Sequence, residues 1–477
     1  MAITRRTTFQ AAPVQAVTSQ NYLDIQNNGW AQQYLPDLIE AEAEVYGKRT
    51  ISGFLSQVGA EEAMSADQVI WSEQGRLHLS YTCDMLDVTA STINITNDID
   101  GVAQTTTHGI RVGDQVLIAG GGQTVTARVS VAAAGSQTIT VQPYRFAHMT
   151  NAGFVNGDNT CTILVFGSEN AKGVSYVGGR SNEPSFTTFT NKPIILKDMY
   201  EVSGSDAAQV GWVEVTGEEG QNGYYWYLKA EGDTRARFTD YLEMSMIESE
   251  LVAAASAIAL PTDGGAGTAG TEGLFAAVRS RGHQTSGVTG VSPLVDFAEF
   301  DAILAEFDRN GAIEENMMFV NRNTSLAMDD MLASLNSGYS GGTSYGVFNN
   351  SEDMALNLGF SGFRRGSYDF YKSDWKYLND LATRGGINNA ATAGEDVRGI
   401  IIPAGTSSVY DQQLGKNLKR PFLHVRYRAS QTDDRRFKTW TTGSVGAATS
   451  ALDAMQLHFL TERCLITQAA NNFMLMK

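Results

Sequence analysis

Residues 452–477 read LDAMQLHFLTERCLITQAANNFMLMK, and apolar side chains continue through them to Met476. Chain termini usually fray into water unless neighbouring structure holds them. A segment this short cannot make a core of its own. The sequence therefore predicts that residues 451–477 form strands that add to a sheet built by earlier parts of the chain.

The length of the chain allows several domains, and the number of its cysteines argues against a disulfide framework. With 477 residues the chain exceeds a single ordinary core, so two to four domains of roughly 100–200 residues are expected. Its three cysteines, Cys83, Cys161 and Cys464, are odd in number and widely spaced. This excludes a disulfide framework and a four-thiolate zinc site, and it fits a reducing compartment. The six histidines show no pair at metal-ligand spacing, so neither a metal nor a cofactor is predicted.

Charge and composition describe an unusual surface. The formal charge of -17 argues against a protein that grips nucleic acid through its phosphates. Charged residues make up 18% of the chain, against a usual ~25%. The chain holds 24 Arg and 11 Lys, and protein interfaces favour Arg over Lys. Two explanations stay open: a surface largely occupied by partners, or a composition bias of the genome.

Nothing in the sequence indicates a membrane protein. No apolar run approaches the ~20 residues needed to cross a bilayer. Residues 4–9, TRRTTF, precede AAPVQAVTSQN in place of the apolar region of an export signal. We therefore expect a cytoplasmic product without a membrane partner.

The first half of the chain reads as an arm, a hairpin and a small β domain. Residues 1–60 are too poor in periodic apolar residues for a core and predict an extended arm, with a short helix at 37–46. Apolar and polar residues alternate over 69–89, which predicts a long hairpin with a turn at Gly75. Short β-branched runs separated by glycine turns over 109–144 predict a small all-β domain at about 87–166, inserted into that hairpin. The chain returns from it with FTTFTNKPIILK.

The second half changes to a helical period. Apolar residues at three- and four-residue steps predict one long helix over about 221–259, with Gly232 as a candidate kink. A glycine-rich loop at 262–273 follows. Beyond it the pattern predicts a helix from Ser292-Pro293 to Asn310, a strand at 317–320 and a helix at about 324–335. Mixed α and β structure continues to about 440, with strands near Phe370, at 400–402 and at 423–427.

The short motifs do not support an enzyme. Gly265, Gly267 and Gly270 satisfy G-x-G-x-x-G, but a helix precedes them where dinucleotide binding needs a strand. Ser373 and Lys376 satisfy S-x-x-K without the partner motifs of penicillin-binding enzymes. Acidic doublets such as Glu61-Glu62 are interpreted as solvated helix ends. No catalytic residue is predicted.

One charged segment carries a hypothesis of its own. Residues 424–440, HVRYRASQTDDRRFKTW, interleave both signs of charge over a predicted strand and turn. Bidentate pairs between arginine and carboxylate suit a contact between identical subunits. Pairing within the chain around a loop is the alternative. The candidate inter-subunit residues are Arg426, Arg428, Asp433, Asp434, Arg435 and Arg436.

The order of these elements resembles the major capsid proteins of tailed bacteriophages, the Hong Kong ninety-seven type of fold that herpesviruses also use. Residues 302–325, AILAEFDRNGAIEENMMFVNRNTS, are similar to the helix and strand of the axial domain in that family. Residues 423–446 and 457–476 are similar to its closing pieces. Taken as a whole, the sequence is most similar to capsid proteins of crAss-like podoviruses.

The resemblance implies an α+β fold in five parts. These are an N-terminal arm (1–60), an extended loop with the β insertion (61–205), a spine helix with the peripheral domain (206–290), an axial domain (291–445) and C-terminal strands that return to the peripheral domain (446–477). Some relatives crosslink neighbours through Lys and Asn, but no Lys lies between 49 and 171, which argues against that crosslink here.

The implied function is assembly. Identical subunits, as hexamers and pentamers, would form an icosahedral shell around double-stranded DNA, with portal and decoration proteins as further partners, in a virion assembled in the bacterial cytoplasm. The alternatives are the shell of a cellular nanocompartment of the same fold and a carbohydrate-acting enzyme with a β accessory module. The enzyme would need two carboxylates in a cleft, and no convincing pair stands out.

Overall fold

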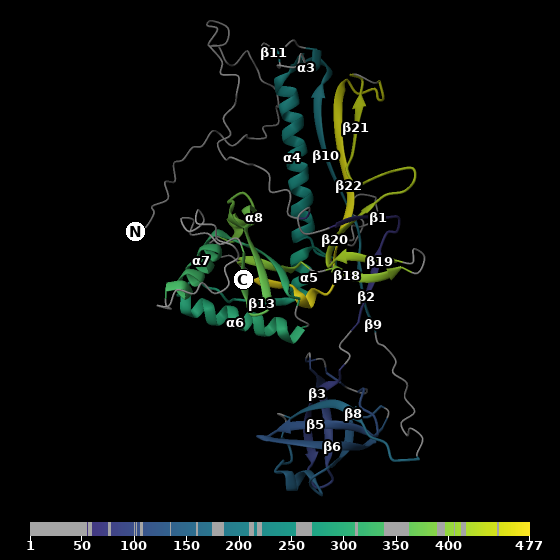
Figure 1. Cartoon of the computed structure of the whole chain (residues 1–477). Coiled ribbons are helices and arrows are strands. Elements are labelled where there is room, and N and C mark those ends of the chain that lie inside the picture. The colour runs from purple at the N-terminus through teal and green to yellow at the C-terminus, as the bar shows by residue number, and fades with distance from the viewer. Residues whose placement is uncertain are drawn as a thin grey trace. The chain divides into compact units, whose positions relative to one another are not determined.

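The structure is a computed structural model of mixed α+β class (Figure 1). It describes residues 55, 60–74, 78–99, 101, 103–104, 108–133, 135–158, 161–173, 186–208, 214–216, 222–253, 270–310, 313–337, 362–388, 396–404, 406–411, 416–445 and 448–477. These residues fall into two compact units, one of Ile70–Phe189 and one of the rest of the described chain. The predicted arm, apart from Leu55 and Ala60, and most of the predicted glycine-rich loop lie outside the described residues.

The unit of Ile70–Phe189 contains a closed barrel with strand order β3-β4-β7-β6-β5-β8. Its strands are β3 (Ser80–Asp87), β4 (Thr92–Asp98), β5 (Asp114–Gly120), β6 (Gln123–Ala132), β7 (Thr138–Pro143) and β8 (Cys161–Ser168). Side chains alternate between the interior and the surface, and Ile93, Ile95 and Ile118 are fully buried. Closure leaves no unpaired strand edge.

Two strands outside the barrel pair with each other. Strand β2 (Val69–Gln74) pairs with β9 (Phe186–Asn191), and the Trp71 and Phe189 rings lie 6.1 Å apart. The returning half predicted at FTTFTN is β9, and it pairs with β2. The first half predicted over 69–89 is too long, because residues 80–87 belong to the barrel and pair with β4 and β8. Alternation alone does not reveal the partner of a strand. The turn predicted at Gly75 lies outside the described residues.

The three cysteines are buried and free. Loss of water around the sulfur raises the pKa of Cys83 to about 12, that of Cys161 to about 11 and that of Cys464 to about 12. A raised thiol pKa favours the folded state fully below the unfolded pKa of roughly 8.5, and that contribution is lost as the pH rises toward the folded values.

We expect these thiols to be unreactive in the folded chain. At pH 8 a colorimetric disulfide reagent should modify none of the three within minutes, because burial keeps the reactive thiolate scarce and inaccessible. In denaturant all three should react. One fast-reacting thiol in the folded protein would contradict the buried placement.

The other unit contains a five-stranded sheet of order β1-β20-β22-β10, with β21 also paired to β22. The strands are β1 (Ala60–Met64), β20 (Leu423–Arg428), β22 (Ala454–Thr467), β10 (Ile194–Ser203) and β21 (Lys438–Gly443). The long β22 pairs with β10 along one edge and with β21 and then β20 along the other. Its residues 463–467 pair with β20 and its residues 455–460 with β21.

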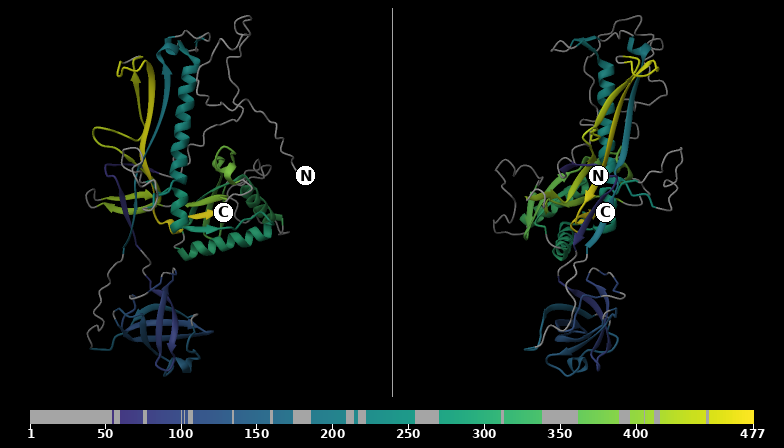
Figure 2. Two further views of the ribbon diagram at one scale, coloured as in Figure 1. Left: turned by 180° about the vertical axis from the view of Figure 1, so that it is seen from behind. Right: turned by 90° about the vertical axis from the view of Figure 1, so that its right-hand side faces the viewer.

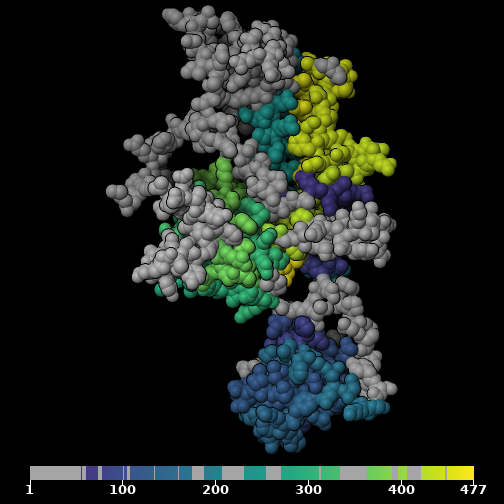
Figure 3. Space-filling view, in the orientation of Figure 1, coloured from purple at the N-terminus to yellow at the C-terminus, as the bar shows by residue number. Residues whose placement is uncertain are grey.

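Helix α4 (Tyr225–Glu248) covers one face of this sheet, and it runs beside β10 and β22 in every view (Figures 1 and 2). Phe238 places its ring 5.5 Å from that of Phe437 and 5.8 Å from that of Phe459. Arg237 forms an ion pair of 3.0 Å with Asp198 of β10. The surfaces of the yellow β21–β22 pair and the teal helix also adjoin in the space-filling view (Figure 3). The short helix α3 (Gly204–Ala208) follows β10.

The long helix ends earlier than its periodicity predicts. The pattern extends to about 259, but α4 ends at Glu248 and Leu251 forms a β-bridge with Gly270. The Gly273 amide donates a hydrogen bond of 2.8 Å to the Ser249 carbonyl, and a side chain at Gly273 would collide with the last carbonyls of the helix. A segment returning from elsewhere in the sequence therefore stops the helix, and local periodicity cannot show this.

Gly232 lies inside α4, which continues through it. No atom lies within 4 Å of the position that a Cβ would take there, so Gly232→Ala should stabilise the chain by about 0.5–1 kcal/mol through helix propensity. Gly385→Ala in α9 (Arg384–Asn388) is the matched control, because its Cβ would lie 2.6 Å from a backbone carbon. Urea unfolding of both variants tests this, and a destabilised Gly232→Ala would contradict it.

A six-stranded sheet of order β13-β23-β17-β14-β16-β15 completes this unit. The strands are β13 (His283–Thr285), β23 (Met474–Met476), β17 (Gly399–Pro403), β14 (Glu315–Val320), β16 (Tyr368–Asp374) and β15 (Gly362–Arg365). The accompanying helices are α5 (Leu274–Arg281), α6 (Pro293–Asn310), α7 (Arg322–Ser337) and α8 (Lys376–Asn379). The predictions of α6, β14 and α7 are confirmed, with shifts of one or two residues at the ends. Two small hairpins, β11 (Glu214–Thr216) with β12 (Asn222–Tyr224) and β18 (Thr406–Asp411) with β19 (Lys416–Pro421), make separate sheets.

The C-terminal tail connects the two large sheets. After β22 the chain passes through the turn η4 (Ala470–Asn472) into β23, which lies between β13 and β17. Phe473, Leu475 and Met476 are fully buried, so the prediction that the tail adds to an earlier sheet is confirmed. The tail is thus covered by its own chain. Strand β22 lies in the five-stranded sheet. Strand β23 lies between β17, in the range that the resemblance assigns to the axial domain, and β13, in the range that it assigns to the peripheral domain.

Candidate assembly surface

Strand β1 is attached to the five-stranded sheet along one edge of β20. The two strands run parallel, with Glu62 opposite Arg426 and Met64 opposite Arg428. The sequence AEEAM has little to bury, and Met64 is the buried apolar residue among residues 61–64. Attachment of this strand therefore depends on backbone hydrogen bonds and charge.

The three carboxylates of residues 61–67 each form an ion pair with an arginine. Glu62 lies 2.8 Å from Arg426, and Asp67 pairs with Arg428. Glu61 accepts from two guanidinium groups, at 2.5 Å from Arg436 and 3.3 Å from Arg463. Most of these pairs are partly exposed, and Asp67 retains 88% of its side-chain exposure. Exposed pairs of this kind contribute little individually, so the network matters more for where the strand docks than for total stability.

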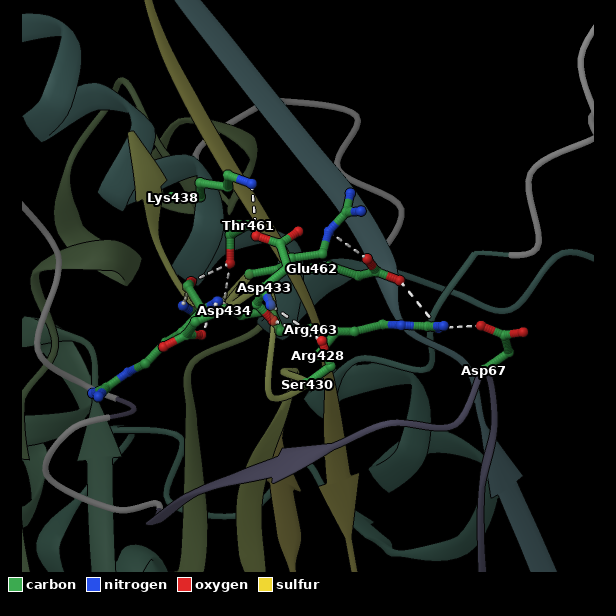
Figure 4. A network of polar contacts seen from close by, with 11 residues as sticks. Asp67, Arg428, Ser430, Asp433, Asp434, Lys438, Thr461, Glu462 and Arg463 are labelled. Carbon is green, nitrogen blue, oxygen red and sulfur yellow. Dashed lines mark hydrogen bonds and ion pairs between the residues drawn. The ribbon is translucent and has the colours of Figure 1, made fainter. Parts of the chain in front are cut away.

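A tight loop between β20 and β21 presents the remaining charges (Figure 4). The Ser430 amide donates to the Asp433 carbonyl at 2.8 Å, and the Arg435 amide donates to the Arg428 carbonyl at 2.9 Å. The Asp433 carboxylate pairs with Lys438 at 2.6 Å. These bonds turn the loop back on itself, so the successive residues 433–436 can point in different directions.

Glu462 of β22 is the carboxylate that two arginines, one in β20 and one in the β20–β21 loop, contact. Its carboxylate lies 2.9 Å from Arg435 and 3.6 Å from Arg428, and its side chain is 9% exposed. Arg428 thereby bridges Glu462 and Asp67, as the dashed lines of Figure 4 show. One guanidinium group joins the residues after β1 to the centre of the sheet.

Arg463 is the basic centre on the opposite face of β22. Its side chain is 6% exposed and forms the ion pair with Glu61. It also donates a hydrogen bond of 3.0 Å to the Thr461 hydroxyl and one of 2.7 Å to the Arg436 carbonyl. Burial lowers the pKa of Arg463, and the negative charges of Glu61 and Glu243 act in the opposite direction. A buried cation of this kind is tolerated only because several acceptors surround it.

All six predicted contact residues lie in this network. Arg426, Arg428, Arg435 and Arg436 form ion pairs within the chain, Asp433 pairs with Lys438, and the Asp434 carboxylate accepts from the Arg436 amide at 2.9 Å. Their role between subunits stays a prediction. Sequence reasoning missed Glu61, Glu62, Asp67, Glu462 and Arg463. The interpretation of Glu61-Glu62 as a solvated helix end is wrong, because both lie in β1 and pair with arginines.

The sheet face opposite α4 is open. Along β10 the residues on that face, Ile195, Lys197, Met199 and Glu201, are exposed, and Ile195 and Met199 retain 51% and 45% of their exposure. Met199 lies opposite His458, whose ring stacks on that of Trp440 at 5.0 Å. This row of Met199, His458 and Trp440 gives the sheet an apolar surface that α4 does not cover.

Groups that would indicate other functions are not found in the described part of the chain. No cluster of three or more potential ligands could hold a metal ion there. No helix among the same residues has the length and apolarity needed to cross a membrane.

Comparison with known proteins gives similarity at the level of structure. No protein-family model matches the chain. No curated protein matches it either. A structure of Microbacterium phage Oxtober96 is 9% identical, with 95% of this chain and 98% of that chain covered at a TM-score of 0.39. The capsid structure of the Cyanophage P-SCSP1u is 8% identical, with 93% of each chain covered at a TM-score of 0.40.

A third matching structure, the capsid of a native GTA particle, is 9% identical, with 96% of this chain and 99% of that chain covered at a TM-score of 0.36. Two of these three structures are described as capsids. The chain is thus similar to phage capsid structures over most of its length, at low sequence identity.

Proposed function

We propose that the chain is a structural shell subunit. Copies associate as hexamers and pentamers into an icosahedral capsid of the Hong Kong ninety-seven type, which encloses packaged double-stranded DNA and becomes part of a virion. In this proposal the five-stranded sheet and α4 form the peripheral domain, the six-stranded sheet forms the axial domain, and the barrel is an insertion in the extended loop.

The observation that carries the proposal is the path of the last segment. Strand β22 is the shared centre of the sheet under α4, and the same segment then ends as β23 inside the six-stranded sheet. The resemblance drawn from the sequence implies a long helix, an axial α+β part and closing strands that return to the peripheral domain. The place of β22 supports that return, whereas β23 continues into the six-stranded sheet. One segment shared by both sheets also fixes them to each other, which suits a shell that resists pressure from packaged DNA.

Exposed apolar side chains support association. Besides the open sheet face, the start of α6 leaves Val291 and Leu294 at 77% and 79% exposure, with Val295 beside them at 41%. Large apolar groups gathered on one surface usually mark a contact site. Many such contacts of moderate size sum to a stable closed shell.

The acidic balance is consistent with a container for DNA. With a charge of -17 the subunit does not attract phosphate over its surface as a whole. A lining that bound DNA tightly would oppose both its packing and its release. No base contact or specific DNA site is part of the proposal.

Sedimentation velocity of the purified chain tests the proposal. We expect a fast boundary from particles that contain many copies, in equilibrium with smaller oligomers, at moderate salt and neutral pH. A single boundary of a 51.5 kDa monomer at every concentration and salt would contradict it. Particles that enclose host protein in place of DNA would favour the nanocompartment alternative.

A further inference from the structure

Strand β1 is attached to its sheet with little burial of apolar side chains. It is a five-residue edge strand, and β20 is its one partner among the described pairings. Glu61 and Ala63 are exposed, and Met64 alone is buried among residues 61–64. Because apolar burial is small, this strand is held mainly by directional contacts, which can be made equally by the same segment of another copy.

The surface that receives β1 is basic in an acidic chain. Six positive side chains gather there against four negative ones. The positive ones are Arg426, Arg428, Arg435, Arg436, Arg463 and Lys438, and the negative ones are Asp433, Asp434, Glu462 and Glu243 of α4. The whole chain carries -17. Without β1 this spot would hold an excess of positive charge. An acidic extended segment complements it, and Glu61, Glu62 and Asp67 supply three carboxylates at matching positions.

We infer that the edge of β20 with its arginines is an acceptor site for the strand β1 of a second copy of this chain. Neighbouring subunits exchange β1, so that each strand makes the parallel ladder and the ion pairs of Glu61, Glu62 and Asp67 with its neighbour. Figure 4 shows one of these pairs, Asp67 with Arg428. This rests on the proposed function, since it needs copies that associate.

Exchange of β1 between two copies costs little free energy, because the strand makes the same contacts within one chain and between two chains. Which copy supplies the strand is then decided by effective concentration, and a closed shell brings identical subunits close together. The connection from β1 to β2, residues 65–68, is exposed or half-buried, so no buried apolar core holds it in one path. Strand exchange would add a mechanical link between subunits without a covalent bond.

Disulfide trapping between two singly substituted chains tests the inference. Ala63 lies opposite Tyr427 across the β1–β20 ladder, at the spacing of neighbouring strands that a disulfide can span. Ala63→Cys and Tyr427→Cys subunits are purified separately, mixed, allowed to associate and oxidised with copper phenanthroline. The native cysteines are buried and serve as an unreactive background. The mixture should give about tenfold more disulfide-linked dimer than either variant alone.

A charge-swapped pair of variants gives the second measurement. Glu62→Arg and Arg426→Glu each place like charges together within one chain, but a mixture restores opposite charges at both sites when β1 is exchanged. We expect mixed oligomers by native mass spectrometry and little association of either variant alone. Glu306→Arg with Arg309→Glu is the matched control, since that pair lies within one helix and mixing should change nothing.

The outcomes separate this inference from the proposed function. Particles that form without any linkage between chains overturn strand exchange and leave the shell proposal standing. Linked dimers without particles support exchange and contradict the shell. A doubly substituted chain, with Ala63→Cys and Tyr427→Cys together, that closes its disulfide only within itself also overturns exchange.

Discussion

Replacing Arg463 by methionine should lower the free energy of unfolding of its unit by about 1–3 kcal/mol, because buried polar groups lose a hydrogen-bond donor. The guanidinium group is 6% exposed and joins Glu61, the Thr461 hydroxyl and the Arg436 carbonyl. Methionine fills a similar volume but leaves Glu61 without one of its two cations and the Arg436 carbonyl without that donor. The loss comes from uncompensated polar groups more than from the ion pair itself.

Urea unfolding followed by circular dichroism measures this change, and hydrogen exchange of residues 454–467 locates it in β22. Arg309→Met is the matched control, because that side chain is 75% exposed and pairs within its own helix, so a change within about 0.5 kcal/mol is expected. An Arg463→Met chain as stable as the control would mean that β1 and Glu61 do not occupy the described position.

Replacing Asn191 by aspartate should cost about 3 kcal/mol or more, because several hydrogen bonds of a buried group are lost together. Asn191 is 1% exposed. Its amide nitrogen donates to the Leu465 carbonyl at 2.6 Å and to the Glu272 carbonyl at 3.0 Å, while its oxygen accepts from the Glu272 amide at 2.8 Å. Aspartate has almost the same shape but cannot donate, and it would face two carbonyl oxygens with a negative charge.

The matched control for this substitution is Asn471→Asp. That side chain is exposed and donates one hydrogen bond of 3.2 Å to the Asn310 carbonyl. Its replacement should change stability by less than about 0.5 kcal/mol. Equal unfolding midpoints for the two variants would show that Asn191 does not join the end of β9, residues 271–272 and β22 as described.

The fold was predictable wherever local pattern and tertiary structure agree. In α6, Ser292-Pro293 starts a helix whose apolar positions keep a regular spacing to Asn310, and the structure has the same bounds. The apolar run at the end of the chain likewise predicts a covered strand. In both cases the apolar pattern that marks the segment as buried lies within the segment itself, so the sequence carries the signal.

The rest depends on partners that are distant in sequence. Leu251 continues the helical period of α4, but its β-bridge with Gly270 ends the helix. The pairing of β2 with β9 joins residues on either side of the whole barrel. No local pattern encodes which of two alternating segments becomes the partner.

The charged network was likewise predictable only where its residues lie close together in the sequence. Interleaved charges over 424–440 point to arginine–carboxylate pairing, and all six chosen residues take part in it. Their partners Glu61, Glu62 and Asp67 lie more than three hundred residues earlier, in or just after a strand too short and too polar to be recognised. Within the network that the structure describes, the buried cation Arg463 differs from the more exposed arginines only through its surroundings.

Negative-stain electron microscopy of the purified full-length chain decides whether copies of it form a closed shell. We expect closed, uniform particles with fivefold and sixfold clusters of subunits. A field of separate compact monomers, which stays unchanged at high protein concentration and resists protease, would contradict it.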